Sequence, residues 1–509
     1  MKKNKFILLT GALSIFFLVS SCDKEFEETN TNQNIPNSVT SDLLLAGVIR
    51  NTVTDQVNEA WGIGNIVAQH TAKIQFVNED RYLWGERNGV WNSVYSNMRN
   101  VQNIIDASNK AIPVQNNYLG VALVMKSWLF SLATDAYGDI PYSEAIQGKT
   151  GGIYTPKYDK QEDVYNGIIA DLKKANDILG TSNETVAGDL IYGGSTLKWR
   201  KFANSLRLRL LLRLSKKKST AADMQAILSD PAKNPIFVNN ADNAELKYLA
   251  AAPNQWPLYG TRVGSFDEFR VSKTLADRLN AIGDPRLKVF GRPSQSSVAA
   301  GNPKIEGIPN GLGDVAALNY NGGPQGVSRV GYSYACLVCN DIGQAVPVPD
   351  VARGAIMTFS ELQFILAEAR ERGFITTGSA ESYYTTGIQA NVDYHASVTP
   401  AAYGINLSLP ANYFTQNAVA YTGSTDEKLG KIALQKWVSL YFNGLEAWFD
   451  WRRTRMPAIV PGPDNLNNNK VPVRYIYPLS EQSLNRVNRD EAVARQGADD
   501  LNTEIWIVK

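Results

Sequence analysis

Histidine and cysteine are scarce in this chain, which has two histidines and three cysteines among 509 residues. A structural zinc site needs about four such ligands close together, and His70 and His395 are far apart in the sequence. Both histidines fall in segments with helical periodicity, so we expect them to be structural. The motifs HExxH, GxxxxGK[ST] and GxSxG are missing as well, which argues against the hydrolase and nucleotide chemistry that they support.

Two enzyme-like features remain after these exclusions. The stretch Gly311-Leu-Gly313-Asp-Val-Ala316 has the GxGxxA spacing of a dinucleotide-binding loop. It follows Pro309 and Asn310 rather than a predicted strand, so we expect no dinucleotide there. A glycosidase needs only a pair of carboxylates, and 49 acidic residues supply many pairs. The sequence therefore favours a non-catalytic protein and leaves a glycosidase open.

The chain also has no run of basic residues that would suit a phosphate backbone. Its net charge of +2 depends on Lys2, Lys3 and Lys5, which lie among 21 residues without an acid. Removing these three lysines from the 51 basic residues leaves 48 against 49 acidic ones. A balanced charge of this kind makes nucleic acid an unfavourable partner.

The N-terminus has the pattern of a bacterial lipoprotein signal. The three lysines precede an apolar stretch, Phe6–Val19, and then Val19-Ser20-Ser21-Cys22. Small residues before a cysteine are what a lipoprotein signal peptidase requires, and we predict lipidation of Cys22 after removal of residues 1–21. An ordinary secretory signal is the alternative. Residues 22–37 are polar and rich in asparagine, which predicts a flexible tether before a single domain over 38–509.

The largely apolar stretch Leu119–Tyr137 predicts a helix at the centre of a large helical core. Apolar residues cover all its faces, as expected for a helix surrounded by other helices. Lys126 near the middle argues against a membrane span. Gly138 can end the helix in a left-handed conformation, with Asp139 and Pro141 forming a turn.

Helical periodicity recurs along most of the remaining chain. The Leu206–Leu210 segment alternates like a strand, yet Trp199, Phe202, Leu206 and Leu210 keep helical spacing. A short strand is expected at 473–479. We predict helices at 38–57 with Ser41 as N-cap, 60–75, 88–111, 160–179, 197–214, 272–281, 358–373, 380–395, 426–451 and 480–487. Their lengths suit tetratricopeptide-like hairpins of about 34 residues, although no clear self-alignment is found.

The region 231–349 has a different character, because glycine, proline, asparagine and aromatic residues replace the helical pattern. More than a hundred irregular residues in a compact protein usually form functional loops. Aromatic rings in such loops suit a glycan site, since the flat C–H faces of sugars pack on them. For any single ring, burial under a loop is the favoured alternative. The candidate rings are Tyr82, Trp84, Trp256, Tyr259, Phe266, Tyr320, Tyr332 and Tyr334.

Cys336-Leu-Val-Cys339 lies inside this region without other cysteines or histidines nearby. In an exported protein this spacing favours a loop disulfide over a redox pair, and free thiols are the alternative. We expect no cofactor. The acidic segment Asp341–Asp350 would permit a structural Ca²⁺ site, which we do not predict.

Four motifs and the lipoprotein signal together resemble the SusD/RagB family of Bacteroidetes outer-membrane lipoproteins, in particular its SusD-like, starch-binding-associated branch. They occur in the order typical of that family and span nearly the whole mature chain. The acidic run after Cys22 also resembles the surface-export signal of Bacteroidetes lipoproteins. The motifs are TDAYGDIPYSEA (Thr134–Ala145), WRKFANSLRLRLLLR (Trp199–Arg213), ELQFILAEARERG (Glu361–Gly373) and WVSLYFNGLEAWFDWRRTRMP (Trp437–Pro457).

The resemblance implies a mainly α fold in which tetratricopeptide-like hairpins form one side and irregular inserts build the ligand face. It implies a non-catalytic, lipid-anchored protein at the cell surface that captures oligosaccharide and delivers it to a SusC-like TonB-dependent transporter. In the family, an early loop and the irregular middle region hold the glycan. The corresponding candidates for glycan binding here are Tyr82, Trp84, Trp256, Tyr259, Tyr320 and Tyr332.

Three other functions stay open at this point. RagB-type relatives take peptides, so peptide capture by the same fold is the first alternative. A helical-repeat scaffold whose partner is purely protein is the second. The glycosidase considered above is the third.

Overall fold

A computed structural model of the protein describes residues 39–181, 184–339 and 345–509. The predicted signal peptide, Cys22 and the tether 22–37 lie outside these residues. The described chain is mainly helical, as expected, and a continuous core of buried side chains extends from Leu45 to Ile507.

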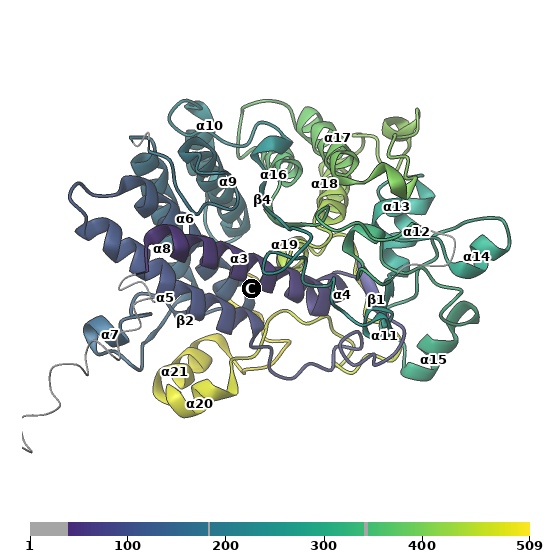
Figure 1. The fold of residues 1–509 in the computed structure, drawn as a ribbon, viewed down its shortest axis with the longest axis horizontal. Helices are drawn as coiled ribbons and strands as arrows, with labels where there is room; N and C mark the ends of the chain where they lie inside the picture. The colour runs from purple at the N-terminus through teal and green to yellow at the C-terminus, as the bar shows by residue number, and fades with distance from the viewer. Residues whose placement is uncertain (1–38, 182–183, 340–344) are drawn as a thin grey trace, which may run out of the picture.

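The N-terminal part of the chain supplies most of the long helices. In Figure 1 they lie together in one half of the molecule, coloured purple to blue-green. Consecutive helices α5 and α6 pack side by side, as do α8 and α9, and α6 also packs against α8. The helices are α3 (Ser41–Glu59), the π-helical turn η1 (Ala60–Gly64), α4 (Asn65–Val67), α5 (Gly89–Lys110), α6 (Asn116–Tyr137), α7 (Gly148–Gly151), α8 (Gln161–Leu179), α9 (Thr196–Leu214) and α10 (Ala221–Ser229).

The C-terminal part adds a further hairpin, in which α16 packs against both α17 and α18. These paired helices confirm the tetratricopeptide-like arrangement expected from the sequence. The elements are α16 (Phe359–Glu371), α17 (Ala380–Val398), η5 (Ala401–Tyr403), η6 (Tyr413–Thr415), α18 (Thr425–Ser439), α19 (Glu446–Thr454), α20 (Leu479–Leu484) and α21 (Arg486–Gln496).

The middle region contains short elements joined by loops, and its helices α12 to α15 lie at the opposite end of the molecule from α8 (Figure 1). The described strands form three antiparallel pairs. β1 with β5 and β4 with β6 connect parts of the chain that are far apart in sequence, whereas β2 and β3 are close together in sequence. The strands are β1 (Thr71–Lys73), β2 (Ile140–Pro141), β3 (Tyr158–Asp159), β4 (Ala244–Lys247), β5 (Phe269–Val271) and β6 (Arg353–Met357). The helices are η2 (Asn240–Asp242), α11 (Val263–Phe266), α12 (Lys273–Ala281), α13 (Leu287–Phe290), α14 (Gln295–Ala299), α15 (Asp314–Asn319), η3 (Tyr320–Gly322) and η4 (Tyr332–Tyr334).

Helix α6 is the buried central helix that the sequence predicts. Of its 22 residues, all but Asn116, Tyr118 and Lys126 are buried. It is long and apolar enough to cross a membrane, but 94% of the relevant window is buried inside the protein, as in the core helix of a globular fold. The Lys126 ammonium pairs with Asp171 of α8 at 2.9 Å. Gly138 ends the helix with a φ of 91°, although its ψ of −118° lies outside the left-handed helical region.

Charged residues from the four sequence motifs meet inside the core. The Arg213 guanidinium on α9 contacts the carboxylates of Asp135 on α6 and Glu446 on α19. One turn earlier, Arg209 Nε donates to Glu361 Oε1 on α16 at 2.7 Å. These five side chains are at least 94% buried. The alternating leucines and arginines of α9 therefore reflect a helix buried on all sides, whose arginines pair with acids from three other helices.

Several predicted boundaries are wrong. The helix predicted at 60–75 is a continuation of α3 through the π-helical turn, and it ends at Val67 before β1. The N-cap of α3, which the sequence predicts at Ser41, is Thr40. The helix predicted at 426–451 breaks between α18 and α19, where Phe442 has a φ of 60° and Gly444 a φ of 51°. The break occurs because Asn65 and Gly64 pack against this segment: the Phe442 amide donates to Asn65 Oδ1 at 3.2 Å.

The strand predicted at 473–479 does not form. The segment is extended, and the Tyr475 amide donates to the Ala136 carbonyl at the end of α6 at 2.8 Å. The short helix predicted at 480–487 is instead two helices, α20 and α21, and α10 was not predicted. These segments pair with distant parts of the chain, so their local pattern does not determine their structure.

Candidate ligand-binding cleft

A cleft of about 1200 Å³ lies between the middle region and the loop after α17. Its walls come from α12, α13, the segment 303–307, the Tyr320 loop, Tyr332 and residues 402–406. Helices α12 and α13 lie at the right of Figure 1. A volume of this size suits an oligomeric ligand better than a single small molecule. Polar residues that line it include Lys273, Asp277, Asn280, Lys288, Arg292, Lys304, Glu306, Asn321 and Asn406.

Close backbone packing forms the wall between α12 and the segment 303–307. Ser272 caps α12, with its hydroxyl accepting from the Thr274 amide at 3.1 Å. The Lys273 amide donates to the Ile308 carbonyl at 2.8 Å, which holds the segment along the start of the helix. Gly307 makes this approach possible, because a Cβ there would lie 2.5 Å from the Lys273 backbone nitrogen.

Three tyrosines line the cleft. The rings of Tyr332 and Tyr403 lie 5.1 Å apart at 34°, and the Arg292 guanidinium lies 4.9 Å from the centre of the Tyr332 ring. Tyr332 and Tyr403 are 7% and 8% exposed, so a ligand would meet only a small part of each. Burial raises the pKa of Tyr403, whose hydroxyl accepts from the Val348 amide at 2.8 Å. Tyr320 is more exposed than either.

The polar groups of the cleft can both donate and accept hydrogen bonds. Asn321 Nδ2 donates to Glu306 Oε2 at 3.2 Å, and Asn280 Nδ2 donates to the Ile305 carbonyl at 3.0 Å. Lys273 pairs with Asp277 at 2.6 Å. Amides, carboxylates and ammonium groups close to tyrosines are suited to holding hydroxyl groups while the rings pack on C–H faces.

The structure separates the six predicted glycan-binding residues into two groups. Tyr320 and Tyr332 line the cleft. Tyr82, Trp84, Trp256 and Tyr259 do not line it: they are between 1% and 7% exposed and belong to the core. Their side chains lie inside the core rather than along this cleft, and their role in glycan binding stays a prediction from the sequence.

Three of the four internal rings instead hold the loops that carry them through hydrogen bonds to backbone carbonyls, and Tyr82 packs edge-on against Trp84. Trp84 Nε1 donates to the Glu79 carbonyl at 2.9 Å, which closes the early loop on itself. Trp256 Nε1 donates to the Tyr334 carbonyl at 3.3 Å, and the Tyr259 hydroxyl donates to the Val348 carbonyl at 3.3 Å. A buried tryptophan or tyrosine normally finds such a partner for its polar group.

Arg292 and Tyr403 line the cleft, but neither is among the predicted candidates. Tyr403 lies in a Pro-Ala-Ala-Tyr-Gly stretch after a predicted helix, a loop context like that of the other candidate rings. It lies outside both regions from which the candidates come, the early loop with Tyr82 and Trp84 and the region 231–349. Arg292 carries no sequence signal, because its position depends on contacts with residues 330 and 339.

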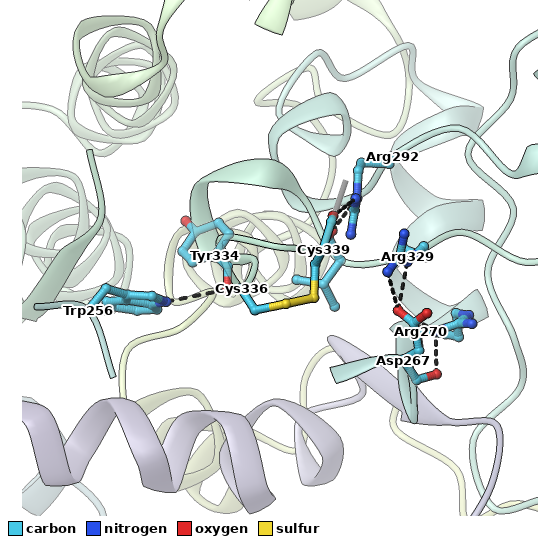
Figure 2. Close-up of a disulfide and its surroundings, with 9 residues drawn as sticks. Trp256, Asp267, Arg270, Arg292, Arg329, Tyr334, Cys336 and Cys339 are labelled. Atoms are coloured by element: carbon cyan, nitrogen blue, oxygen red, sulfur yellow. Dashed lines mark hydrogen bonds and ion pairs between the residues drawn. A yellow bond between two sulfur atoms is a disulfide. The ribbon is translucent and has the colours of Figure 1, made fainter. Parts of the chain in front are cut away.

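Cys336 and Cys339 form a disulfide, as the sequence favours. Figure 2 shows it beside Arg292 and Tyr334. His70 and His395 are buried and structural, also as expected, although His70 lies in a bend before β1 rather than in a helix. Gly313 precedes the short helix α15, and the residues just before Gly311 form no strand.

Among residues 39–181, 184–339 and 345–509, no group of three or more histidine, cysteine, aspartate or glutamate side chains is arranged to hold a metal ion. The segment Asp341–Asp350, which would permit Ca²⁺, lies partly outside the described residues.

The fold and the cleft together define a class: a helical-hairpin protein whose long insert builds a ligand-sized cleft. Residues 32–478 match the model of the SusD-like family, described as starch-binding and associating with the outer membrane. The chain belongs to this SusD-like family. A search of curated protein sequences returned no match.

Solved structures agree with the family assignment. A SusD homologue from Bacteroides fragilis is 26% identical, with a TM-score of 0.79, over 93% of this chain and 100% of that one. A chitin-binding protein is 29% identical, with a TM-score of 0.75, over 91% of this chain and 100% of that one. A chitin-binding SusD homologue from Flavobacterium johnsoniae shares the fold at 22% identity and a TM-score of 0.72, over 91% of this chain and 98% of that one.

Proposed function

We propose that this protein is a lipid-anchored protein of the cell surface that captures oligosaccharide in the cleft and delivers it to a SusC-like TonB-dependent transporter. The observation that carries the proposal is the cleft itself, because it combines tyrosines with paired donors and acceptors in a member of a starch-binding-associated family. The predicted lipidation at Cys22 supports attachment to the outer membrane.

Chitin oligosaccharide is the first ligand to test, because a 29% identical relative that is covered along its whole length is a chitin-binding protein. Calorimetry of the purified protein against a panel of chitin, starch and other glycans would measure binding directly. We expect one of these glycans to bind. Binding of peptides alone would favour the RagB-type alternative, and binding of neither class would favour a protein-interaction scaffold.

Tyr320→Ala tests whether the ligand occupies this cleft. Tyr320 is partly exposed in the cleft, and loss of one sugar–ring contact should weaken binding by about 0.5–1.5 kcal/mol, or roughly two- to tenfold in Kd. Tyr154→Ala is the matched control, because Tyr154 is 80% exposed and does not line the cleft. Equal affinities for the two variants would place the ligand elsewhere.

We propose no catalytic role. The residues that line the cleft include carboxylates, but Asp277 is paired with Lys273 and Glu306 accepts from Ser294 and Asn321. Product analysis of chitin and starch oligosaccharides after prolonged incubation with the protein should show them intact. Shortened products that disappear in Glu306→Gln would establish the glycosidase alternative.

A further inference from the structure

We propose that the Cys336–Cys339 disulfide is a positioning device for the cleft, which acts through Arg292 to hold Tyr332 against Tyr403. This inference rests on the proposed function, because it assigns a role in that same cleft. It assigns a role in the cleft to the cysteine pair, to the buried Arg292 and to the buried Tyr332 and Tyr403.

The disulfide closes the end of a loop that begins at the cleft. The loop follows η4, and its two cysteines are fully buried. The Cys339 amide donates to the Cys336 carbonyl at 3.0 Å, so a tight turn and a covalent bond fix the same four residues. The disulfide therefore determines where the Cys339 carbonyl points.

Arg292 joins the two ends of this loop. Its Nε donates to the Val330 carbonyl at 2.9 Å, and its Nη1 donates to the Cys339 carbonyl at 2.6 Å. Arg292 is 1% exposed, and Figure 2 shows it beside Cys339. Because the guanidinium is planar and rigid, two carbonyls held at fixed positions help to set its orientation.

The ring of Tyr332 lies on this guanidinium. The distance from the guanidinium carbon to the ring centre is 4.9 Å, within the range of a cation–π contact. Tyr332 then packs on Tyr403, which comes from a loop more than sixty residues later in the chain. The contacts thus run from the disulfide to Arg292, from Arg292 to Tyr332, and from Tyr332 to Tyr403.

The other side of the loop is held from within the core. Trp256 Nε1 donates to the Tyr334 carbonyl at 3.3 Å, as Figure 2 shows, and the Leu337 amide donates to the Tyr259 carbonyl at 3.2 Å. These anchors keep the backbone of η4 in place when the disulfide is absent. Removing the disulfide should therefore loosen the Cys339 carbonyl and Arg292 without unfolding the region.

The test uses the full-length protein in four variants: Cys336→Ala/Cys339→Ala, Arg292→Met, the combination of all three substitutions, and Leu172→Ala. Leu172 is fully buried in α8, at the opposite end of the molecule from α12 to α15 (Figure 1), and its substitution controls for loss of stability alone. Two quantities are measured for each protein: the Kd for chitin hexasaccharide, and the deuterium uptake of peptides that cover 400–406.

We expect the double cysteine variant and Arg292→Met each to raise the Kd by about two- to tenfold, since a ligand must then immobilise side chains that were held before. The combined variant should be no weaker than Arg292→Met, because the disulfide acts through that residue. Deuterium uptake at 400–406 should increase in all three variants, and Leu172→Ala should change neither quantity.

Unchanged uptake at 400–406 in the cysteine and arginine variants would overturn the inference, whatever the ligand. Fully additive effects of the disulfide and Arg292 on the Kd would overturn it too. If chitin hexasaccharide binds none of the proteins while uptake at 400–406 rises as expected, the positioning role stands and chitin is rejected as the ligand. If the Kd and the uptake at 400–406 increase in Leu172→Ala as much as in the other variants, the disulfide acts only through the general stability of the protein.

Discussion

Individual aromatic residues in this protein take their role from what surrounds them, not from the loop that carries them. Trp84 and Trp256 lie in irregular segments, yet both are buried and donate their Nε1–H to a backbone carbonyl. Tyr320 lies in a similar segment and faces the cleft. The glycine- and asparagine-rich context is common to all three, so it cannot distinguish a support from a ligand contact.

Burial also determines the protonation of the two histidines. His70 is fully buried, its Nε2 lies 3.0 Å from the Trp437 carbonyl, and its ring lies 4.5 Å from that of Trp437. Burial lowers the pKa of His70 to about 3, and the hydrogen bond opposes this only partly. Burial also lowers the pKa of His395 to about 3.

Acidification should therefore destabilise the protein through its histidines. The unfolded state binds a proton at each histidine near pH 6.5, whereas the folded state does not until about pH 3, so stability falls as the pH drops below 6.5. At pH 5 the loss should be about 2 kcal/mol for each histidine. Urea unfolding at pH 7 and pH 5 should show that His70→Gln loses less stability than the wild type by about this amount. An equal loss in the two proteins would contradict the prediction.

At the scale of elements, the core depends on close contacts between helices that the sequence separates widely. The π-helical turn after α3 passes against the break between α18 and α19, so that Gly64 meets the backbone of Gly444. A Cβ at Gly64 would lie 2.1 Å from the Gly444 carbonyl oxygen. The break in the long predicted helix and the turn at 60–64 are therefore two sides of one contact.

Gly64→Ala should disrupt this contact. A methyl group cannot fit at 2.1 Å from a backbone oxygen, so one of the two elements must shift, at a cost of about 1–3 kcal/mol in the free energy of unfolding. Gly62→Ala is the matched control in the same turn, because a Cβ there meets nothing within 4 Å. Chemical denaturation should find the control neutral or slightly more stable, since alanine restricts the unfolded chain. Similar stabilities for both variants would show that the contact can relax.

The whole molecule combines paired helices with a long insert, whose helices α12 to α15 lie at the opposite end from α8 (Figure 1). The insert and residues 402–406 line the cleft. Membership of a family that associates with the outer membrane agrees with the N-terminal signal pattern. The means of attachment rests on Cys22, which lies outside the described residues, and it remains a prediction from the sequence.

Cys22→Ser should abolish lipid attachment, because the thiol that would carry diacylglycerol is replaced. We expect cells that express the wild type to incorporate labelled palmitate into the protein, and cells that express Cys22→Ser not to. Ser21→Ala keeps a small residue before the cysteine and should label like the wild type. Labelling of Cys22→Ser would place the lipid on another residue, and absence of label in the wild type would favour an ordinary secretory signal.

The sequence by itself determined where most helices lie, because periodic apolar residues such as those of α5, α8 and α9 encode burial of one face or of all faces. It also indicated the family, because four motifs occur along the chain in the order typical of that family, and a family model confirms the assignment. It supplied two of the residues that line the cleft, Tyr320 and Tyr332, and the disulfide.

Only the tertiary structure decided which aromatic rings line the cleft, where the C-terminal helices break, and that Arg292 and Tyr403 belong to the cleft. The physical reason is that these properties depend on neighbours far away in the chain. Phe442 takes its conformation beside Asn65, and Arg292 is fixed by carbonyls at 330 and 339. A local pattern records what a residue needs to be buried in a helix, but not which distant segment will cover it.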